Sequence, residues 1–98
     1  MPYTLENVER LNAAHPATFH IPSRTEREGL RRGDVAKLIF TLPKPINGCE
    51  SERMWVEVTG RDGDDYLGEL DNDPLFPDEL GIKWRSPVRF RACHVASI

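Results

Sequence analysis

The stretch that decides the fold reads RMWVEVTGRDGDDYLGEL and covers residues 53–70. Its first seven residues alternate between two kinds of side chain, which is the period-two pattern of a strand with one buried face. The expected buried face carries Met54, Val56 and Val58. The opposite face carries Arg53, Trp55, Glu57 and Thr59. The pattern therefore predicts a strand over 53–59, with its tryptophan pointing away from the apolar row.

A tight turn is expected directly after this strand. The segment 60–65 contains the pair Asp62-Gly63, which is a strong β-hairpin signal. Residues 66–70 then return as the partner strand, and the run Asp71-Asn72-Asp73-Pro74 ends it. Residues 75–83 contain Pro77 and Gly81, so we expect at most one helical turn there.

Two more strands are expected on either side of this hairpin. Residues 35–42 have strong strand character, and residues 87–92 alternate with Val88, Phe90 and Ala92 inward. The segment 43–52 contains two prolines and Asn47-Gly48, which predict a loop.

Helical signals precede the strands. Thr4 can cap a helix that begins at Leu5, and His15-Pro16 ends it because the residue before a proline is disfavoured in a helix. Ser23 and Glu26 match a capping box, which predicts a short polar helix or turn after it.

Ninety-eight residues are enough for one domain with one core. Within it, residues 1–16 form the N-terminal helix region and residues 17–98 a β-rich part. The expected fold class is α+β, with an N-terminal helix covering a small, strongly bent antiparallel sheet or partly open barrel of about 4–5 strands.

The composition bears on the cellular compartment of the protein. No apolar run approaches the roughly 18–20 residues of a membrane span, and the first residues lack the features of a signal peptide. Cys49 and Cys93 show no metal-site spacing and no disulfide framework, so two free thiols and a cytoplasmic location are expected.

Charge is unevenly placed along the chain. The net charge is −3, which disfavours nucleic-acid binding by bulk charge. Residues 60–81 carry eight acidic side chains and one basic one, whereas residues 82–98 carry four basic and no acidic ones. The acidic block is either a set of ordinary turn residues near the last strand or a patch that binds a basic partner protein.

The second interpretation gives a candidate protein-binding site. A tryptophan on a mixed strand face is either covered core or part of an interface, since this residue is enriched among interface hot spots. With the acidic residues around it, the candidate binding set is Trp55, Glu57, Asp64, Asp65, Asp71, Asn72 and Asp73.

The alternative function is a small nucleic-acid-binding domain that uses two arginine clusters. These comprise Arg24, Arg27, Arg31 and Arg32, and then Arg85, Arg89 and Arg91. Catalytic, metal and cofactor sites have no motif in the sequence. Cys93 and His94 are neighbours on the expected last strand, so their side chains would point to opposite faces and could not form a nucleophile–base pair.

Several segments together resemble a known family. They are FHIPS at 19–23, LRRGD at 30–34, VAKLIF at 35–40, RMWVEV at 53–58 and GELDNDP at 68–74. Residues 17–95 resemble the bacterial domain-of-unknown-function 2314 family, while the segment 77–84 and Ser86-Pro87 depart from its pattern. The resemblance implies a small bacterial cytoplasmic domain with no established reaction.

The sequence therefore favours a non-enzymatic protein-binding module with a protein partner and no cofactor. Its concrete form would be an immunity-type protein that neutralises a partner through the acidic edge. Neither the partner's identity nor an oligomeric state follows from the sequence.

Overall fold

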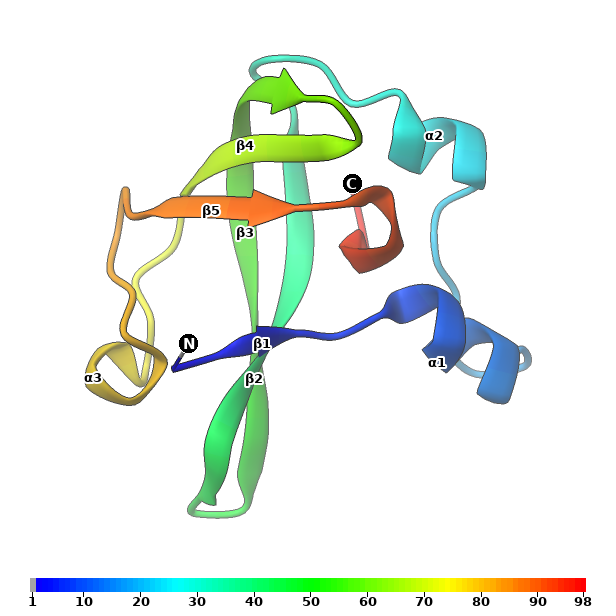
Figure 1. The fold of residues 1–98 in the computed structure, drawn as a ribbon. Helices are drawn as coiled ribbons and strands as arrows, with labels where there is room; N and C mark the ends of the chain where they lie inside the picture. Colours follow the sequence, from blue (N-terminus) through cyan, green and yellow to red (C-terminus); the bar gives the residue numbers. More distant parts are fainter. Residues whose placement is uncertain (1) are drawn as a thin grey trace.

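The computed structural model describes residues 2–98 and joins five antiparallel strands in the order β1-β2-β3-β4-β5. The strands are β1 (Thr4–Leu5), β2 (Val35–Ile46), β3 (Cys49–Asp62), β4 (Asp65–Leu70) and β5 (Pro87–Phe90). The helices are α1 (Val8–Ala14), α2 (Arg24–Glu28), α3 (Pro77–Leu80) and the 3₁₀ helix η1 (Ala92–His94). The sheet curls into a half-barrel (Figure 1), which confirms the predicted α+β class.

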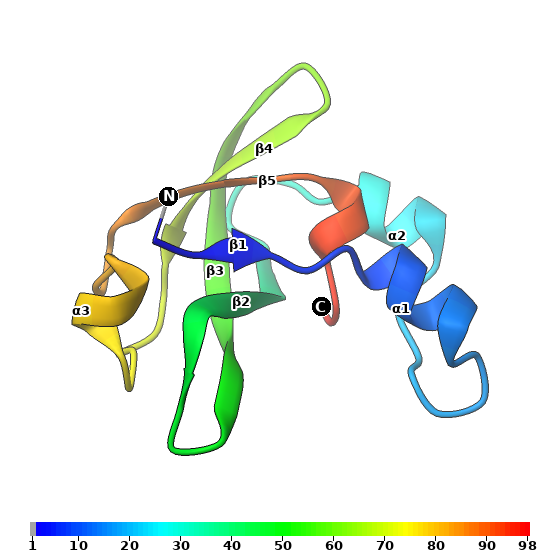
Figure 2. The ribbon, with the colours of Figure 1, turned by 60° about the horizontal axis from the view of Figure 1, so that its bottom comes forward.

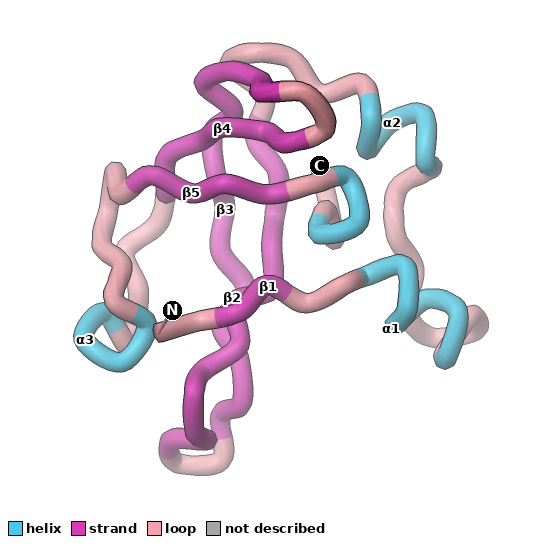
Figure 3. Tube along the Cα trace, in the orientation of Figure 1, coloured by secondary structure: helices cyan, strands magenta, loops and turns pink. Residues whose placement is uncertain are grey.

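The expected central hairpin is confirmed. Met54, Val56 and Val58 are buried, and the turn between β3 and β4 contains Gly63 at φ 60°. The register shifts between Val58 and Gly60 on β3, as at a β-bulge. Because a bulge bends the strand that contains it, β4 and β5 run across β2 rather than alongside it (Figure 3).

The predicted loop at 43–52 is wrong. β2 continues to Ile46 and β3 begins at Cys49, so this segment is a hairpin that projects beyond the rest of the sheet (Figure 1). Asn47 and Gly48 both have positive φ, at 50° and 82°, as a two-residue hairpin turn of type I′ requires. The prolines at 43 and 45 fall where the pairing between β2 and β3 is irregular, a position where a missing N–H does little harm.

The last part of the chain closes one side of the half-barrel. β5 ends at Phe90, two residues earlier than expected, and the chain turns through η1 back to β2. There the Lys37 N–H donates to the Ser97 carbonyl and the Ala96 N–H donates to the Lys37 carbonyl, both at 2.9 Å. Figure 2 shows this C-terminal segment returning beside β1, so the edge of β2 is shared between the two ends of the chain.

The expected start of the first helix is also wrong. Thr4 and Leu5 pair with β2 as the short strand β1, and the helix begins at Val8. Asn7 is the N-cap, because its side-chain oxygen accepts from the Arg10 N–H at 3.2 Å. The end of the helix at His15 and the Ser23 capping box of α2 are confirmed. Helix α1 covers the sheet through Val8, which packs with Ile39 and Ala96.

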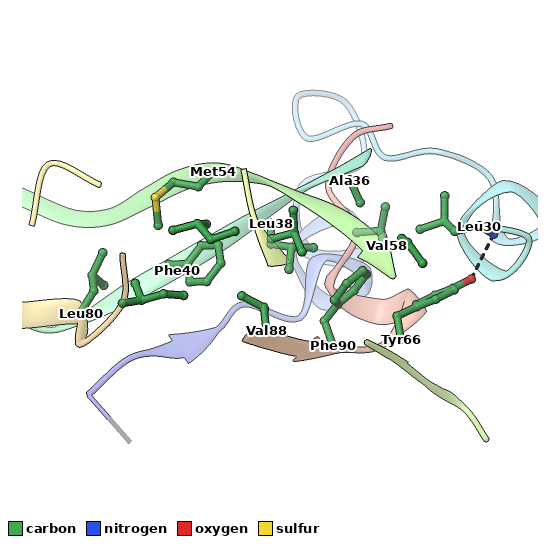
Figure 4. Close-up of a cluster of buried hydrophobic side chains, with 14 of the residues drawn as sticks. Leu30, Ala36, Leu38, Phe40, Met54, Val58, Tyr66, Leu80, Val88 and Phe90 are labelled. Atoms are coloured by element: carbon green, nitrogen blue, oxygen red, sulfur yellow. Dashed lines mark hydrogen bonds between the residues drawn. The ribbon is translucent and has the colours of Figure 1, made fainter. Parts of the chain in front are cut away.

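The main core fills the concave side of the sheet (Figure 4). Tyr66 stacks on Phe90 with ring centroids 5.1 Å apart. The buried Tyr66 hydroxyl donates to the Arg27 carbonyl at 2.7 Å and accepts from the Leu30 N–H at 3.2 Å. Burial of each large apolar side chain contributes roughly 1.5–3 kcal/mol, while these two hydrogen bonds fix where the loop after α2 lies.

Candidate functional site

Trp55 lies on the outer face of β3 and is half-buried, outside the main core. The Lys37 ammonium of β2 lies 4.9 Å from the centre of its ring, a cation–π distance. The backbone N–H of Trp55 donates to the Asn72 side-chain oxygen, and the backbone carbonyl of Trp55 accepts from the Asp71 backbone N–H, both at 2.9 Å. The ring therefore belongs neither to the main core nor to the exposed large hydrophobic residues.

Two members of the acidic block are neutralised by the last strand. Asp65 accepts from Arg89 at 2.7 Å and from Arg91 at 2.6 Å, and Arg89 also pairs with Asp62. These hydrogen bonds from Arg89 and Arg91 lower the pKa of the Asp65 carboxyl below its ordinary value. Asp65 is thus committed to an internal ion pair and is a poor candidate for binding a partner.

Glu57 is also paired internally. The Arg85 guanidinium lies 3.4 Å from carboxylate oxygens of both Glu57 and Glu69. All three side chains are partly exposed, so this pair contributes little stability. The single positive charge of Arg85 offsets one of the two negative charges at this point of the outer face.

The remaining carboxylates separate into two places. Asp64 lies in the β3–β4 turn, at one end of β4. After the other end of β4, the segment 71–79 carries four exposed carboxylates without an ion pair among residues 2–98: Asp71, Asp73, Asp78 and Glu79. We call this segment the acidic loop. The predicted edge is therefore not one continuous patch.

The acidic loop presents an apolar residue that the sequence analysis missed. Leu75 is 78% exposed, the largest fraction among the exposed large hydrophobic residues. Its N–H donates to the Glu52 carboxylate at 2.6 Å, and Asn72 is fixed to Trp55, so β3 anchors the loop at two points. Asn72 thus has a structural role. The available signal was a Leu-Phe pair enclosed by prolines in an otherwise polar segment.

The alternative basic patch is largely neutralised. Arg27 is 5% exposed and donates to Glu9, Pro22 and Ala92, so it cannot contact nucleic acid. Arg24 pairs with Glu28 on its own helix. Together with Arg85, Arg89 and Arg91, five of the seven candidate arginines have carboxylate partners. Arg31 and Arg32 lack a carboxylate partner within residues 2–98, whereas the fold brings acidic residues next to Arg27, Arg85, Arg89 and Arg91.

The surface groove between β1 and β5 has few groups that could act in catalysis. A groove of about 580 Å³ between β1 and β5 is lined mainly by apolar residues, with Arg89 and His94 at its margin. His94 lies on η1 rather than on a strand, and its Nδ1 accepts from the Arg91 N–H at 2.9 Å. Burial raises the pKa of the neighbouring Cys93 thiol and lowers the pKa of His94, which makes a thiolate–imidazolium pair unfavourable.

The described part of the chain was also compared with the requirements of metal sites, disulfides and membrane-spanning helices. Within residues 2–98, no group of three or more His, Cys, Asp or Glu side chains is placed to hold a metal ion. Both cysteines are free, as predicted, and no helix there has the length and apolarity to cross a membrane. Compared with protein-family models, with curated proteins and with solved structures, the chain gives no match.

Replacing Trp55 with alanine is expected to lower the free energy of unfolding by about 1–2 kcal/mol, between the surface and core ranges. The ring is half-buried, and the Lys37 contact is lost with it. Urea unfolding followed by circular dichroism measures the change. Ser51→Ala, an exposed position on the same face of the same strand, is the control and should cost less than about 0.5 kcal/mol. A loss of 3–5 kcal/mol for Trp55→Ala would place the ring in the core.

Proposed function

We propose that this protein is a non-enzymatic binding module that recognises a basic partner protein with its acidic loop. The observation that carries the proposal is a highly exposed leucine held on an anchored segment among unpaired carboxylates. An apolar anchor surrounded by a charged rim is the usual arrangement of a protein–protein interface. Because the loop is already fixed on β3, little conformational freedom would be lost on binding.

The nature of the loop favours a protein over other partners. Four carboxylates would repel a phosphate backbone, and the arginines that could attract one are mostly paired internally. A basic protein surface would be steered toward the loop by charge and could cover the Leu75 side chain. The free charge is concentrated on one segment, so the complementary surface on the partner is expected to be small.

An immunity-type protein of bacteria, acting in the cytoplasm, is the concrete form of this proposal. Such a protein would cover a basic site on a toxic partner, and the resemblance to the domain-of-unknown-function 2314 family supports the bacterial cytoplasmic setting. The two free cysteines are consistent with a reducing compartment.

The test is a comparison of partner binding by three variants. Proteins captured from the source cells by the wild-type chain are identified by mass spectrometry, and the affinity of each purified candidate is measured by calorimetry. Leu75→Ser should lower the affinity for the correct partner at least tenfold, which is the loss expected at an interface hot spot. Asp73→Asn should lower this affinity less, and the difference in affinity between Asp73→Asn and the wild type should shrink in high salt.

Asp64→Asn is the matched control, since it removes one exposed carboxylate at the other end of β4. It should leave the affinity unchanged. If Leu75→Ser binds every captured protein as well as the wild type, the acidic loop is not the recognition surface.

A further inference from the structure

A row of three side chains crosses the outer face of the sheet. Lys37 on β2 lies opposite Trp55 on β3, and Asp71 follows β4 directly and is joined to Trp55 by its N–H. Their sequence neighbours Ala36, Val56 and Leu70 are buried, so alternation points the three side chains outward. Adjacent strands lie about 4.8 Å apart, which spaces the row evenly: a cation, an aromatic ring and an anion.

Neither charge of this row is paired with an opposite charge within the part of the chain that the structure describes. Lys37 contacts the Trp55 ring, and neither Lys37 nor Asp71 has an ion-pair partner among residues 2–98. Asp71 is exposed and Lys37 is half-buried against the ring. The two ends of the row are therefore available to charges of opposite sign from outside.

The surroundings of the row are suited to contact with another surface. Val35 and Trp84 are 38% and 52% exposed, and Val35 pairs with Glu57, next to Trp55. The Arg85 guanidinium pairs with both Glu57 and Glu69 and lies 4.7 Å from the centre of the Trp84 ring. Exposed apolar area, beside a cluster in which Arg85 offsets one of two carboxylates, thus borders the row.

The row is complementary to itself. A two-fold axis that lies in the contact plane, parallel to the strands and through Trp55, exchanges the two ends of the row. Lys37 of one copy then faces Asp71 of the other, twice, and the two tryptophans meet at the axis. A contact of this isologous kind is the commonest way in which identical chains associate.

We propose that the outer face binds a second copy of this chain through the reciprocal Lys37–Asp71 contact. The charge order of the row selects the occupant, because any other partner would need a matching cation, ring and anion at the same spacing. The homodimer is independent of partner recognition by Leu75, although Asp71 belongs to both the row and the acidic loop.

Sedimentation velocity over a range of concentrations tests this proposal. The wild-type chain should dimerise, and raising the salt concentration should weaken the dimer. Lys37→Glu and Asp71→Lys should each weaken self-association at least tenfold, because each variant brings like charges together at both contacts. An equimolar mixture of the two variants should dimerise again, since both contacts in the mixed pair then join a cation to an anion.

Thermal melts of both variants, checked against the wild type, show that each remains folded. Leu75→Ser is expected to dimerise like the wild type, which separates this proposal from the function of the acidic loop. A wild-type chain that stays monomeric up to about 1 mM, where even a weak complex forms, overturns the proposal. A mixture of Lys37→Glu and Asp71→Lys that stays monomeric while the wild type dimerises overturns it as well.

Discussion

Replacing Arg27 with methionine is expected to lower the free energy of unfolding by about 3 kcal/mol, because its hydrogen bonds are lost where water cannot replace them. The guanidinium donates to the Glu9 carboxylate at 2.6 Å, to the Pro22 carbonyl at 3.0 Å and to the Ala92 carbonyl at 3.1 Å. These contacts tie α1, α2 and η1 together at the edge of the sheet (Figure 2). Methionine fills similar space without a donor, so both carbonyls lose this partner.

Arg24→Met on the same helix is the matched control. The Arg24 side chain is 80% exposed, and its only ion pair within residues 2–98 is with Glu28, which is itself half-exposed. Such a pair contributes little, so the control should change stability by less than about 0.5 kcal/mol. Urea unfolding of the three proteins makes the comparison, and equal losses for the two variants would show that the buried guanidinium does not stabilise the helices.

Replacing Gly68 with alanine is expected to cost about 3 kcal/mol, at the upper end for overpacking of a core. A Cβ at this position would lie 2.6 Å from Val56 Cγ1 and 2.7 Å from the Glu57 carbonyl oxygen. It would also approach the Phe90 ring at 3.4 Å. The backbone oxygen cannot rotate away, so β3 and β4 must separate where the hairpin supports the core.

Gly60→Ala in the adjacent strand is the control, since the nearest atom to its added Cβ would be a Leu67 methyl group at 3.9 Å. That is an ordinary van der Waals distance, and the change should stay within about 1 kcal/mol. The measurement is the midpoint of urea unfolding, which reports stability when the dependence of the unfolding free energy on urea concentration is the same in both variants. A Gly68→Ala protein as stable as the Gly60→Ala protein would mean that the strands have room at this point.

The candidate site was only partly predictable. Alternation correctly placed Trp55 on the face opposite Met54, because the two faces of a strand follow from the sequence alone. The charge map left open whether the acidic block lies beside the last strand or forms a binding patch, and the structure places Asp65 against Arg89 and Arg91, which lie 24 and 26 residues away in the chain. Leu75 was missed because exposure depends on what surrounds a residue.

The fold was predictable where a signal was local. The Ser23 capping box needs only neighbouring residues, and the chain forms it as expected. Thr4 fits a helix cap equally well, yet it pairs with Thr41 on β2, so a distant strand outweighed the local preference. The hairpin turn at Asn47-Gly48 was read as part of a loop because the flanking prolines are unfavourable in a regular strand.

Periodicity, turn residues and caps act over a few residues, so the central β3–β4 hairpin, its inward apolar row, the end of α1 at His15 and the Ser23 cap of α2 followed from the sequence alone. Three further features depend on the tertiary structure. It buried Arg27, it divided the acidic block into paired and free carboxylates, and it aligned Lys37, Trp55 and Asp71 across three strands. Each of these depends on which segments the curled sheet brings together, and a charge or an exposed side chain acquires its role only from those neighbours.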